Sequence, residues 1–320
     1  MGRTTPAKRS KPTAPAPAGN GRAPNRPVRR HGGRAATLAW LLVGVLFAAG
    51  AFLYARERAT GGGVVEPPAR GLPATPDYHS LLVDAANPNR LLLGTHVGVY
   101  ESTNGGVAWR FAGLEGRDAM HFARNLDGNV WAAGHNILER SEDGGRTWKA
   151  VRPHGLPGLD IHGFAASPKV DGLVYAAVAG KGLYRSDDGG RSFRLISEDV
   201  GPRVGALAIT KDGMLFAADA DRGVLVNANG DGVEWVKALA MPTLGLAANA
   251  LDPPRSRVLA AGRSVQLTTD RGVWKVVLPI RRGAGPVAFA PSNPRIAYAV
   301  GFDRRLYRSD DAGETWRRVA

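Results

Sequence analysis

From about residue 76 onward, the hydrophobic positions fall into short runs that are separated by turn-forming residues. Near the end of the chain these runs lie at 287–290, 296–300, 305–308 and 316–319. In the middle of the chain they lie at 164–166, 174–178, 182–185 and 193–196. Short apolar runs bounded by Asn-Pro or Asp-Gly pairs are typical of β-strands rather than helices. The pattern therefore predicts successive antiparallel units of four strands.

A polar motif follows the third run of each unit and occurs six times. The clearest copies read SEDGGRTW at 141–148, SDDGGRSF at 186–193 and SDDAGETW at 309–316, and STNGGVAW at 102–109 is a looser copy. Two degenerate copies end at Trp235 and Trp274, so the terminal aromatic residues are 39 to 45 positions apart. The residues assigned to this motif are Ser102, Asn104, Gly106, Trp109, Ser141, Asp143, Gly145, Trp148, Ser186, Asp188, Gly190, Phe193, Asp270, Gly272, Trp274, Ser309, Asp311, Gly313 and Trp316.

The motif has the composition of a hairpin turn. Serine and aspartate oxygens can accept hydrogen bonds from the N–H groups of the turn itself, and glycine supplies a positive φ. We expect the aromatic residue to begin the next strand and to pack against a neighbouring unit. A calcium site is the alternative, but each loop offers too few convergent oxygens for one. We interpret these carboxylates as structural.

Six units of about 40 residues, each with four strands, match the repeat length and strand number of β-propeller blades. One blade cannot bury both of its faces, so the blades must stack in a ring. The predicted fold is all-β: a six-bladed β-propeller with four-stranded antiparallel blades over residues 76–320.

The repeats resemble the Asp-box, or BNR, repeat, which occurs in sialidases, sortilin-type receptors and a photosystem assembly factor. The resemblance covers about residues 76–320. The segments DYHSLLVD, LLLGTHVGVYEST and GLDIHGFAAS are similar to a bacterial group that is usually labelled glycosyl hydrolase-like. Because unrelated chemistries share one fold, the resemblance implies an architecture and does not imply an activity.

The N-terminal region predicts a membrane anchor. Residues 35–54 carry no charge and match the roughly 20 residues that span a bilayer. Residues 1–34 carry nine Lys or Arg and no acidic residue, which orients this end toward the cytoplasm. A cleaved signal peptide is the alternative, but its apolar core is usually about 7–15 residues long. We predict a disordered basic cytoplasmic tail (1–34), a transmembrane helix (35–54) and a linker (55–75). The protein would be a single-pass protein of a bacterial inner membrane, with a periplasmic or extracellular propeller.

Charge and composition limit the classes of binding partner and of site chemistry that we expect. Most of the net charge of +14 belongs to the basic tail. The tail has no interleaved aromatic residues, so we expect it to face lipid headgroups and expect no nucleic acid partner. The chain has no cysteine, which excludes disulfides, thiolate metal sites and cysteine nucleophiles.

Catalytic motifs are missing from the sequence. A sialidase of this class would carry an Arg-Ile-Pro motif before its first blade, where the chain has Asp77-Tyr78-His79. There is no Gly-x-Ser-x-Gly, phosphate loop or His-Glu-x-x-His, and no spacing indicates a glycosidase carboxylate pair. We therefore assign no catalytic residue.

Histidines recur at related positions in the first three units. His79, His121 and His162 stand where the first strand of a unit begins, and His96 and His135 stand where the second strand ends. Adjacent strands of a blade are antiparallel, so both positions lie at the mouth of the channel that faces away from the Asp boxes. An aspartate stands two or three residues before each histidine that begins a first strand. The candidate metal or ligand residues are His79, His96, His121, His135, His162, Asp77, Asp118 and Asp160.

Converging imidazoles without thiolates suit Zn, Cu, Ni or Fe, and carboxylates can orient them. Alternatively, these histidines only line a polar rim and satisfy backbone groups. The leading hypothesis is a binding or scaffold propeller that engages a protein, a small ligand or a metal at this mouth. The alternative is a sialidase-like glycoside hydrolase that acts on glycans at the same mouth.

Overall fold

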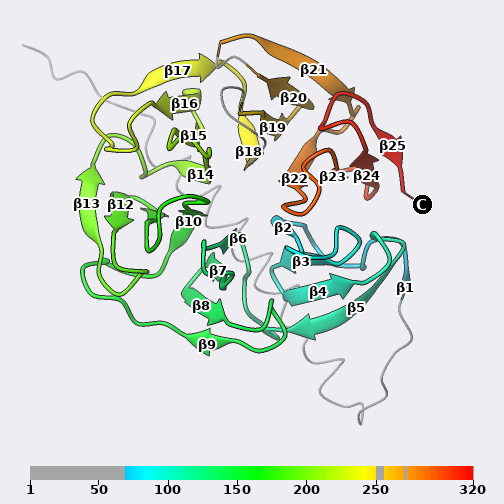
Figure 1. Cartoon of the computed structure of the whole chain (residues 1–320), viewed down its shortest axis with the longest axis horizontal. Helices are drawn as coiled ribbons and strands as arrows, with labels where there is room; N and C mark the ends of the chain where they lie inside the picture. Colours follow the sequence, from blue (N-terminus) through cyan, green and yellow to red (C-terminus); the bar gives the residue numbers. More distant parts are fainter. Residues whose placement is uncertain (1–68, 250–255, 270–271, 320) are drawn as a thin grey trace, which may run out of the picture. The chain divides into compact units, whose positions relative to one another are not determined.

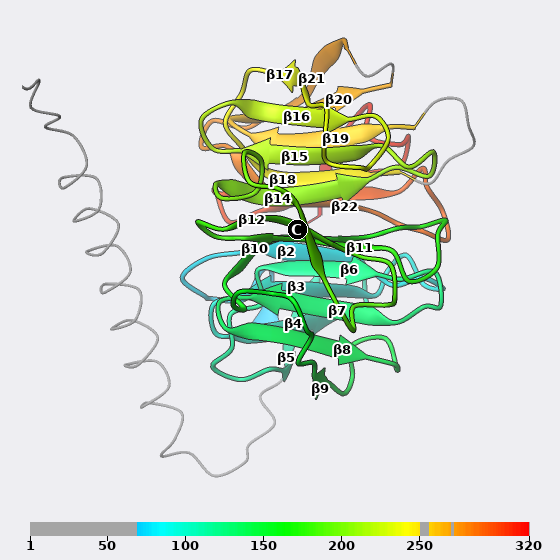
Figure 2. The ribbon, with the colours of Figure 1, turned by 90° about the vertical axis from the view of Figure 1, so that its left-hand side faces the viewer.

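The computed structural model describes residues 69–249, 256–269 and 272–319. These residues form six antiparallel sheets that are arranged as blades of a ring (Figure 1). In the side view the strands run from one face of the ring to the other (Figure 2). The six-bladed propeller is therefore confirmed. The predicted tail, transmembrane helix and most of the linker lie outside the described residues, and no described helix is long and apolar enough to cross a bilayer.

Each blade is built from four consecutive strands, ordered from the centre of the ring outward. Blades 1 to 3 contain β2 (Ser80–Val83), β3 (Leu91–Thr95), β4 (Gly98–Ser102), β5 (Ala108–Gly113), β6 (His121–Arg124), β7 (Val130–Gly134), β8 (Ile137–Ser141), β9 (Lys149–Ala150), β10 (Ile161–Ala166), β11 (Val174–Val178), β12 (Gly182–Ser186) and β13 (Arg194–Ser197). Blades 4 to 6 contain β14 (Val204–Ile209), β15 (Leu215–Asp219), β16 (Gly223–Asn227), β17 (Val236–Leu239), β18 (Thr243–Ala248), β19 (Val258–Gly262), β20 (Ser264–Thr268), β21 (Trp274–Pro279), β22 (Ala284–Phe289), β23 (Ala297–Gly301), β24 (Leu306–Ser309) and β25 (Arg317–Arg318).

Blade 1 has an additional outer strand. β1 (Ala69–Arg70) pairs with β5, with Ala69 opposite Trp109. This strand lies within the segment predicted as linker. The ordered sheet of blade 1 therefore starts before residue 76.

The core lies between the blades. The second strand of every blade is buried along its whole length, as in β7 (VWAAG) and β11 (VYAAV). Each of these strands is covered on both faces by neighbouring blades, which explains why they read as continuous apolar runs rather than alternating ones. The outermost strands β9 and β25 are exposed and consist of lysine, alanine and arginine.

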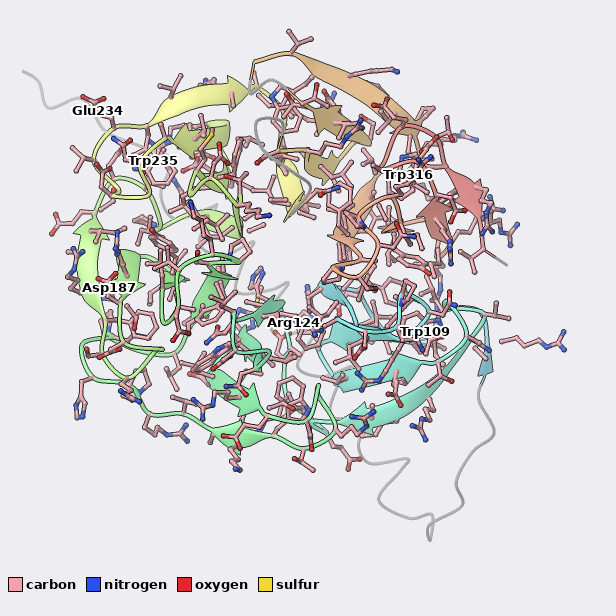
Figure 3. All side chains as sticks on the ribbon, in the orientation of Figure 1. Trp109, Arg124, Asp187, Glu234, Trp235 and Trp316 are labelled. Carbon is pink, nitrogen blue, oxygen red and sulfur yellow. The ribbon has the colours of Figure 1, made fainter. Side chains whose placement is uncertain are left out.

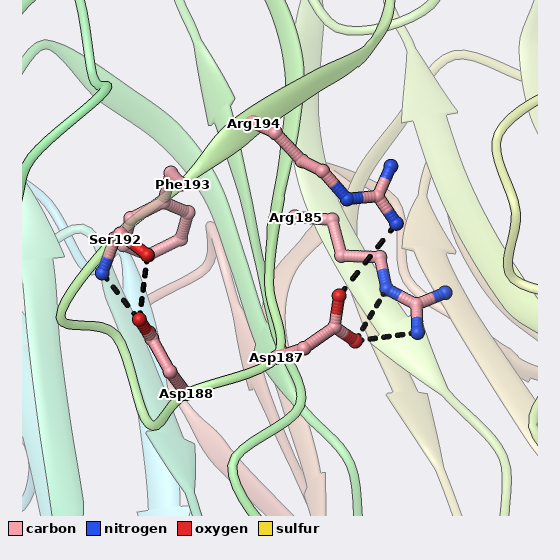
Figure 4. Close-up of a pocket in the computed structure, with 6 residues that line it drawn as sticks. All are labelled: Arg185, Asp187, Asp188, Ser192, Phe193 and Arg194. Carbon is pink, nitrogen blue, oxygen red and sulfur yellow. Dashed lines mark hydrogen bonds and ion pairs between the residues drawn. The ribbon is translucent and has the colours of Figure 1, made fainter.

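The Asp boxes close the turns between the third and fourth strands. In blade 2, Ser141 Oγ accepts a hydrogen bond from Gly145 N at 2.7 Å, and Asp143 accepts hydrogen bonds from both the backbone N–H and the hydroxyl of Thr147. Figure 4 shows the equivalent turn of blade 3, where Asp188 accepts the same pair of bonds from Ser192. The shallow hollow at this turn is lined by side chains that are already paired, so it is an unpromising binding site. Asp270 of the fifth box lies outside the described residues.

The aromatic residues of the boxes pack between blades, away from the centre of the ring (Figure 3). Trp109 is buried against Tyr298 and Leu306 of blade 6. Trp148 packs against Leu92 of blade 1 and is half-buried, as is Trp316 in its own cluster. The inter-blade contact agrees with the sequence prediction, but only some of these indoles are fully enclosed.

The ring closes through side chains between blades 6 and 1. The Tyr298 hydroxyl donates to Pro88 O at 3.0 Å, and Arg308 Nη1 donates to Asn89 Oδ1 at 3.0 Å. Within the described ranges, no strand is exchanged between the first and last blades, because each blade is built from its own consecutive strands.

Candidate functional site

The candidate site lies at the mouth opposite the Asp boxes, on turns of blades 1 to 3. His96 and His135 each begin a two-residue turn, since Thr95 pairs with Gly98 and Gly134 pairs with Ile137. The tight turns point both histidines out of the ends of buried strands. His79 stands just before β2, where its backbone N–H donates to Gly94 O at 2.9 Å.

Asp118 reaches the site because two glycines make room for its backbone. A Cβ on Gly94 would lie 2.1 Å from Ala119 O, and a Cβ on Gly134 would lie 1.9 Å from Asp118 O. Only glycine fits at either position. The segment that leads into β6 therefore passes between the ends of β3 and β7, and this places Asp118 between His96 and His135.

Three residues form what we call the inner triad: Asp77, His79 and His96. His79 Nε2 lies 2.5 Å from His96 Nδ1 and 3.2 Å from Asp77 Oδ1, and His96 Nδ1 contacts Asp77 Oδ2. The exposed fractions of these side chains are 19–24%. The three donor groups thus converge on one small, largely enclosed volume.

A second set, the outer triad, consists of His135, Asp160 and His162. His135 Nε2 lies 2.9 Å from His162 Nε2, and Asp160 Oδ1 lies 3.0 Å from His162 Nε2 and 3.5 Å from His135 Nε2. These side chains are 34–51% exposed. The outer triad is therefore more open to solvent than the inner triad.

Asp118 joins the two triads. Its Oδ2 lies 2.7 Å from His135 Nδ1 and 3.3 Å from His96 Nε2. The residue is only 8% exposed, yet neither carboxylate oxygen makes a well-directed hydrogen bond to any described group. Seven of the eight residues predicted for the site thus form one connected array, which we call the histidine–aspartate string: Asp77, His79, His96, Asp118, His135, Asp160 and His162.

His121 departs from the predicted arrangement. It lies within β6, opposite Ala133, whereas His79 precedes its strand and His162 is the extra residue of a bulge between Ile161 and Gly163. Side chains of successive strand residues point to opposite faces, so a shift of one position changes the direction of the imidazole. His121 Nε2 is enclosed and has no hydrogen-bond partner in the described chain, and the residue belongs to neither triad. The prediction that three histidines share one blade position was therefore wrong in register.

Local electrostatics differ along the string. Burial works against ionisation of Asp77, but hydrogen bonds to His79 and His96 outweigh it and hold the pKa of this carboxyl below its usual range. Burial likewise opposes protonation of His96, yet the carboxylates of Asp77 and Asp118 raise its pKa, while contact with Asp118 raises the pKa of His135. Burial lowers the pKa of His121 to about 3, so this imidazole is neutral at ordinary pH.

The other half of the mouth has a different chemical character. Leu244, in the bulge of β18, and Phe302, in the turn after β23, are 55% and 41% exposed. Exposed arginines occupy the neighbouring turns of blades 5 and 6, namely Arg263, Arg281, Arg282, Arg304 and Arg305. In blade 4, Val204 pairs with Asp219 as Ile161 pairs with Val178, so Gly205 is the counterpart of His162.

The two halves meet at the centre of the ring. A cavity of about 50 Å³ is lined by His79 and His121 from blades 1 and 2 and by Leu244 and Pro286 from blades 5 and 6. The mouth therefore combines imidazoles and carboxylates on one side with apolar and cationic side chains on the other.

Comparisons with known proteins place the chain among Asp-box propellers. A xyloglucanase from Paenibacillus sp is 29% identical over 184 residues, which cover 51% of this chain but only 17% of that enzyme. Among solved structures, the GH74 xyloglucanase from Xanthomonas campestris matches 79% of this chain and 47% of its own at 18% identity, with a TM-score of 0.54. YCF48 from Cyanidioschyzon merolae matches 79% of this chain and 88% of its own at 17% identity, with a TM-score of 0.50. These structural matches show the fold alone. Residues 77–320 match the family described as photosynthesis system II assembly factor YCF48, and the chain belongs to that family.

Proposed function

We propose that this protein is a membrane-anchored, extracytoplasmic binding propeller that engages a segment of a protein partner at the mouth opposite the Asp boxes. The two-sided character of the mouth carries the proposal. Exposed Leu244 and Phe302 lie beside arginines in blades 5 and 6, and the histidine–aspartate string lies across the centre of the ring. Polypeptides offer apolar, charged and hydrogen-bonding groups together, as protein interfaces require.

Family membership supports a protein partner, because the family is described as an assembly factor. The proposed anchor at residues 35–54 and the basic tail support the location. An anchored propeller would meet the extracytoplasmic segments of other membrane proteins, so we propose such a segment as the partner class.

Site-specific photo-crosslinking tests this proposal. A photoreactive phenylalanine analogue replaces Leu244 in the full chain in native membranes. A matched probe replaces Val236 on the outer strand β17, which is 65% exposed but distant from the mouth by topology. We expect a discrete protein adduct from position 244 that disappears when Phe302→Ser is added. The same adducts from both positions, or an adduct insensitive to Phe302→Ser, would refute the proposed surface.

A glycoside hydrolase is the second candidate function, favoured by the identity to the Paenibacillus xyloglucanase. The chain spans about a sixth of that enzyme's length, so the activity does not transfer with the match. The carboxylates of the histidine–aspartate string, Asp77, Asp118 and Asp160, all lie against imidazoles. Incubation of the purified chain with xyloglucan and a panel of synthetic glycosides decides the point. Sugar release that is abolished by Asp118→Asn would establish hydrolysis and displace the binding proposal.

A further inference from the structure

We propose that the histidine–aspartate string is a paired binding site for divalent transition metals, with one ion in the inner triad and one in the outer triad. In this arrangement Asp118 accepts hydrogen bonds from a histidine of each triad. Metal binding goes beyond the partner proposal and is measured on this chain alone, so either proposal can fail without the other.

The two nitrogens of each imidazole determine how many ions fit. His96 directs Nδ1 toward the inner triad and Nε2 toward Asp118, while His135 directs Nε2 toward the outer triad and Nδ1 toward Asp118. A neutral imidazole has one lone-pair nitrogen and one N–H. If Nδ1 of His96 and Nε2 of His135 bind ions, the remaining N–H of each ring faces the same carboxylate oxygen, Asp118 Oδ2.

A third grouping of His96, Asp118 and His135 also lies within ligand distance of one point. It uses the opposite nitrogens, His96 Nε2 and His135 Nδ1, so it competes with both triads. One central ion would leave His79, Asp77, Asp160 and His162 without a role, whereas two outer ions use all six triad residues. The paired arrangement therefore makes fuller use of the donors, and it gives Asp118 the part that carboxylates commonly play behind metal-bound histidines.

Asp118 is an independent indication that the string is built for a ligand. A carboxylate that is more than nine-tenths buried normally has its oxygens hydrogen-bonded. Here both oxygens lie within 3.7 Å of ring nitrogens of His79, His96 or His135, yet none of these contacts is a well-directed bond among the described residues. Ions in the triads would fix the tautomers of His96 and His135 so that each presents an N–H to Asp118.

The distances and donor types indicate the kind of ion. Two ligand atoms on a tetrahedral Zn²⁺ at about 2.0–2.1 Å lie about 3.3 Å apart. The outer-triad contacts of 2.9, 3.0 and 3.5 Å bracket this separation. In the inner triad, the His79–Asp77 contact of 3.2 Å is already close to it, whereas the two contacts of His96 Nδ1 are shorter and would open slightly on binding. Nitrogen and oxygen donors without sulfur suit Zn, Cu, Ni or Fe. We expect the inner ion to bind more tightly because its ligands are more enclosed.

The test is zinc titration of the full-length chain, purified in detergent and stripped with a chelator, with bound metal counted by elemental analysis after dialysis. We expect two ions per chain in the parent protein and one each in His79→Ala and His162→Ala. The control His154→Ala replaces an exposed histidine outside the string and should retain both ions. Asp118→Asn should retain both ions but lower the affinity for each ion by about 10–100-fold, as loss of a carboxylate behind metal-bound histidines typically does.

Co²⁺ absorption provides a second readout, because nitrogen coordination gives visible bands that depend on an intact site. Circular dichroism of each variant establishes that the fold is retained. Zinc binding by the His79→Ala/His162→Ala double variant that equals the parent would overturn the proposal. So would a single ion that survives both single variants but is lost in Asp118→Asn, since that result identifies the central grouping.

Discussion

The box tryptophans permit a quantitative test of inter-blade packing. Trp148 stacks on Phe122 with ring centroids 6.2 Å apart, and it packs in the cluster that contains Leu92 and Ile137. Truncation of a fully buried tryptophan costs about 3–5 kcal/mol. Trp148 is half-buried, and its indole N–H is enclosed without a hydrogen-bond partner among described groups, which offsets part of its packing. We therefore expect Trp148→Ala to lower the free energy of unfolding by about 2–3 kcal/mol.

For a domain of this size, each kcal/mol shifts the melting temperature by roughly 2–4 °C, so Trp148→Ala should melt about 4–12 °C lower. Thermal and urea unfolding of the full chain, followed by tryptophan fluorescence and circular dichroism, measure the change.

Two phenylalanine substitutions test the packing argument more specifically. Trp148→Phe keeps a ring beside Phe122 and removes the unpaired N–H, so it should stay within about 1 kcal/mol of the parent. Trp109→Phe removes a hydrogen bond from Nε1 to Gly106 O at 3.0 Å within a buried cluster, so it should be the more damaging of the two. The packing account fails if Trp148→Ala is neutral, or if Trp148→Phe is the worse phenylalanine variant.

Three further results are expected. A reporter fused to the C-terminus should be active only outside the cytoplasm, and the chain should stay in membranes after high-salt washing; a soluble shortened form would contradict the anchor at 35–54. Below about pH 4 the fold should weaken, because hydrogen bonds of the box hold the pKa of Asp311 at about 2 against its burial, whereas the unfolded value is 3.8. The stability contributed by ionised Asp311 is fully present above the pKa of the unfolded state and is lost as the pH falls toward the pKa of the folded state. Asp311→Asn should therefore make the melting temperature depend less steeply on pH in acid, and an unchanged dependence would contradict the stabilising role assigned to the box carboxylate. Gly134→Ala should destabilise by about 1–3 kcal/mol because its Cβ would meet Asp118 O, whereas Gly205→Ala, whose Cβ would meet nothing within 4 Å of the described chain, should be nearly neutral in urea unfolding.

The blade number could be predicted from sequence because each Asp box marks one turn of one blade and the boxes recur at nearly constant spacing. The strands at 174–178 and 182–185 matched β11 and β12 to within one residue for the same reason. The histidines could be assigned to one mouth because antiparallel strands put known ends on the same side.

Register at the mouth could not be predicted in the same way. The bulge at His162 and the in-register position of His121 depend on how connections pack between blades, and neither has a local sequence signal. Asp118 became central only through the close approach allowed by Gly94 and Gly134. The exposed Leu244 and Phe302 share no motif, so the sequence contains no signal that an apolar side chain would be exposed at either position.

The absence of strand exchange between the first and last described blades bears on how this chain can be re-engineered. Every blade is a contiguous stretch, and short connections such as residues 240–242 join an outer strand to the next inner strand. A circularly permuted chain that starts at β18, ends at β17 and joins β25 to β1 would keep every hairpin and every blade interface. In that permutant, new termini would flank the apolar half of the mouth. A tether or fluorophore attached there could report on ligands at the mouth without altering a residue of the histidine–aspartate string.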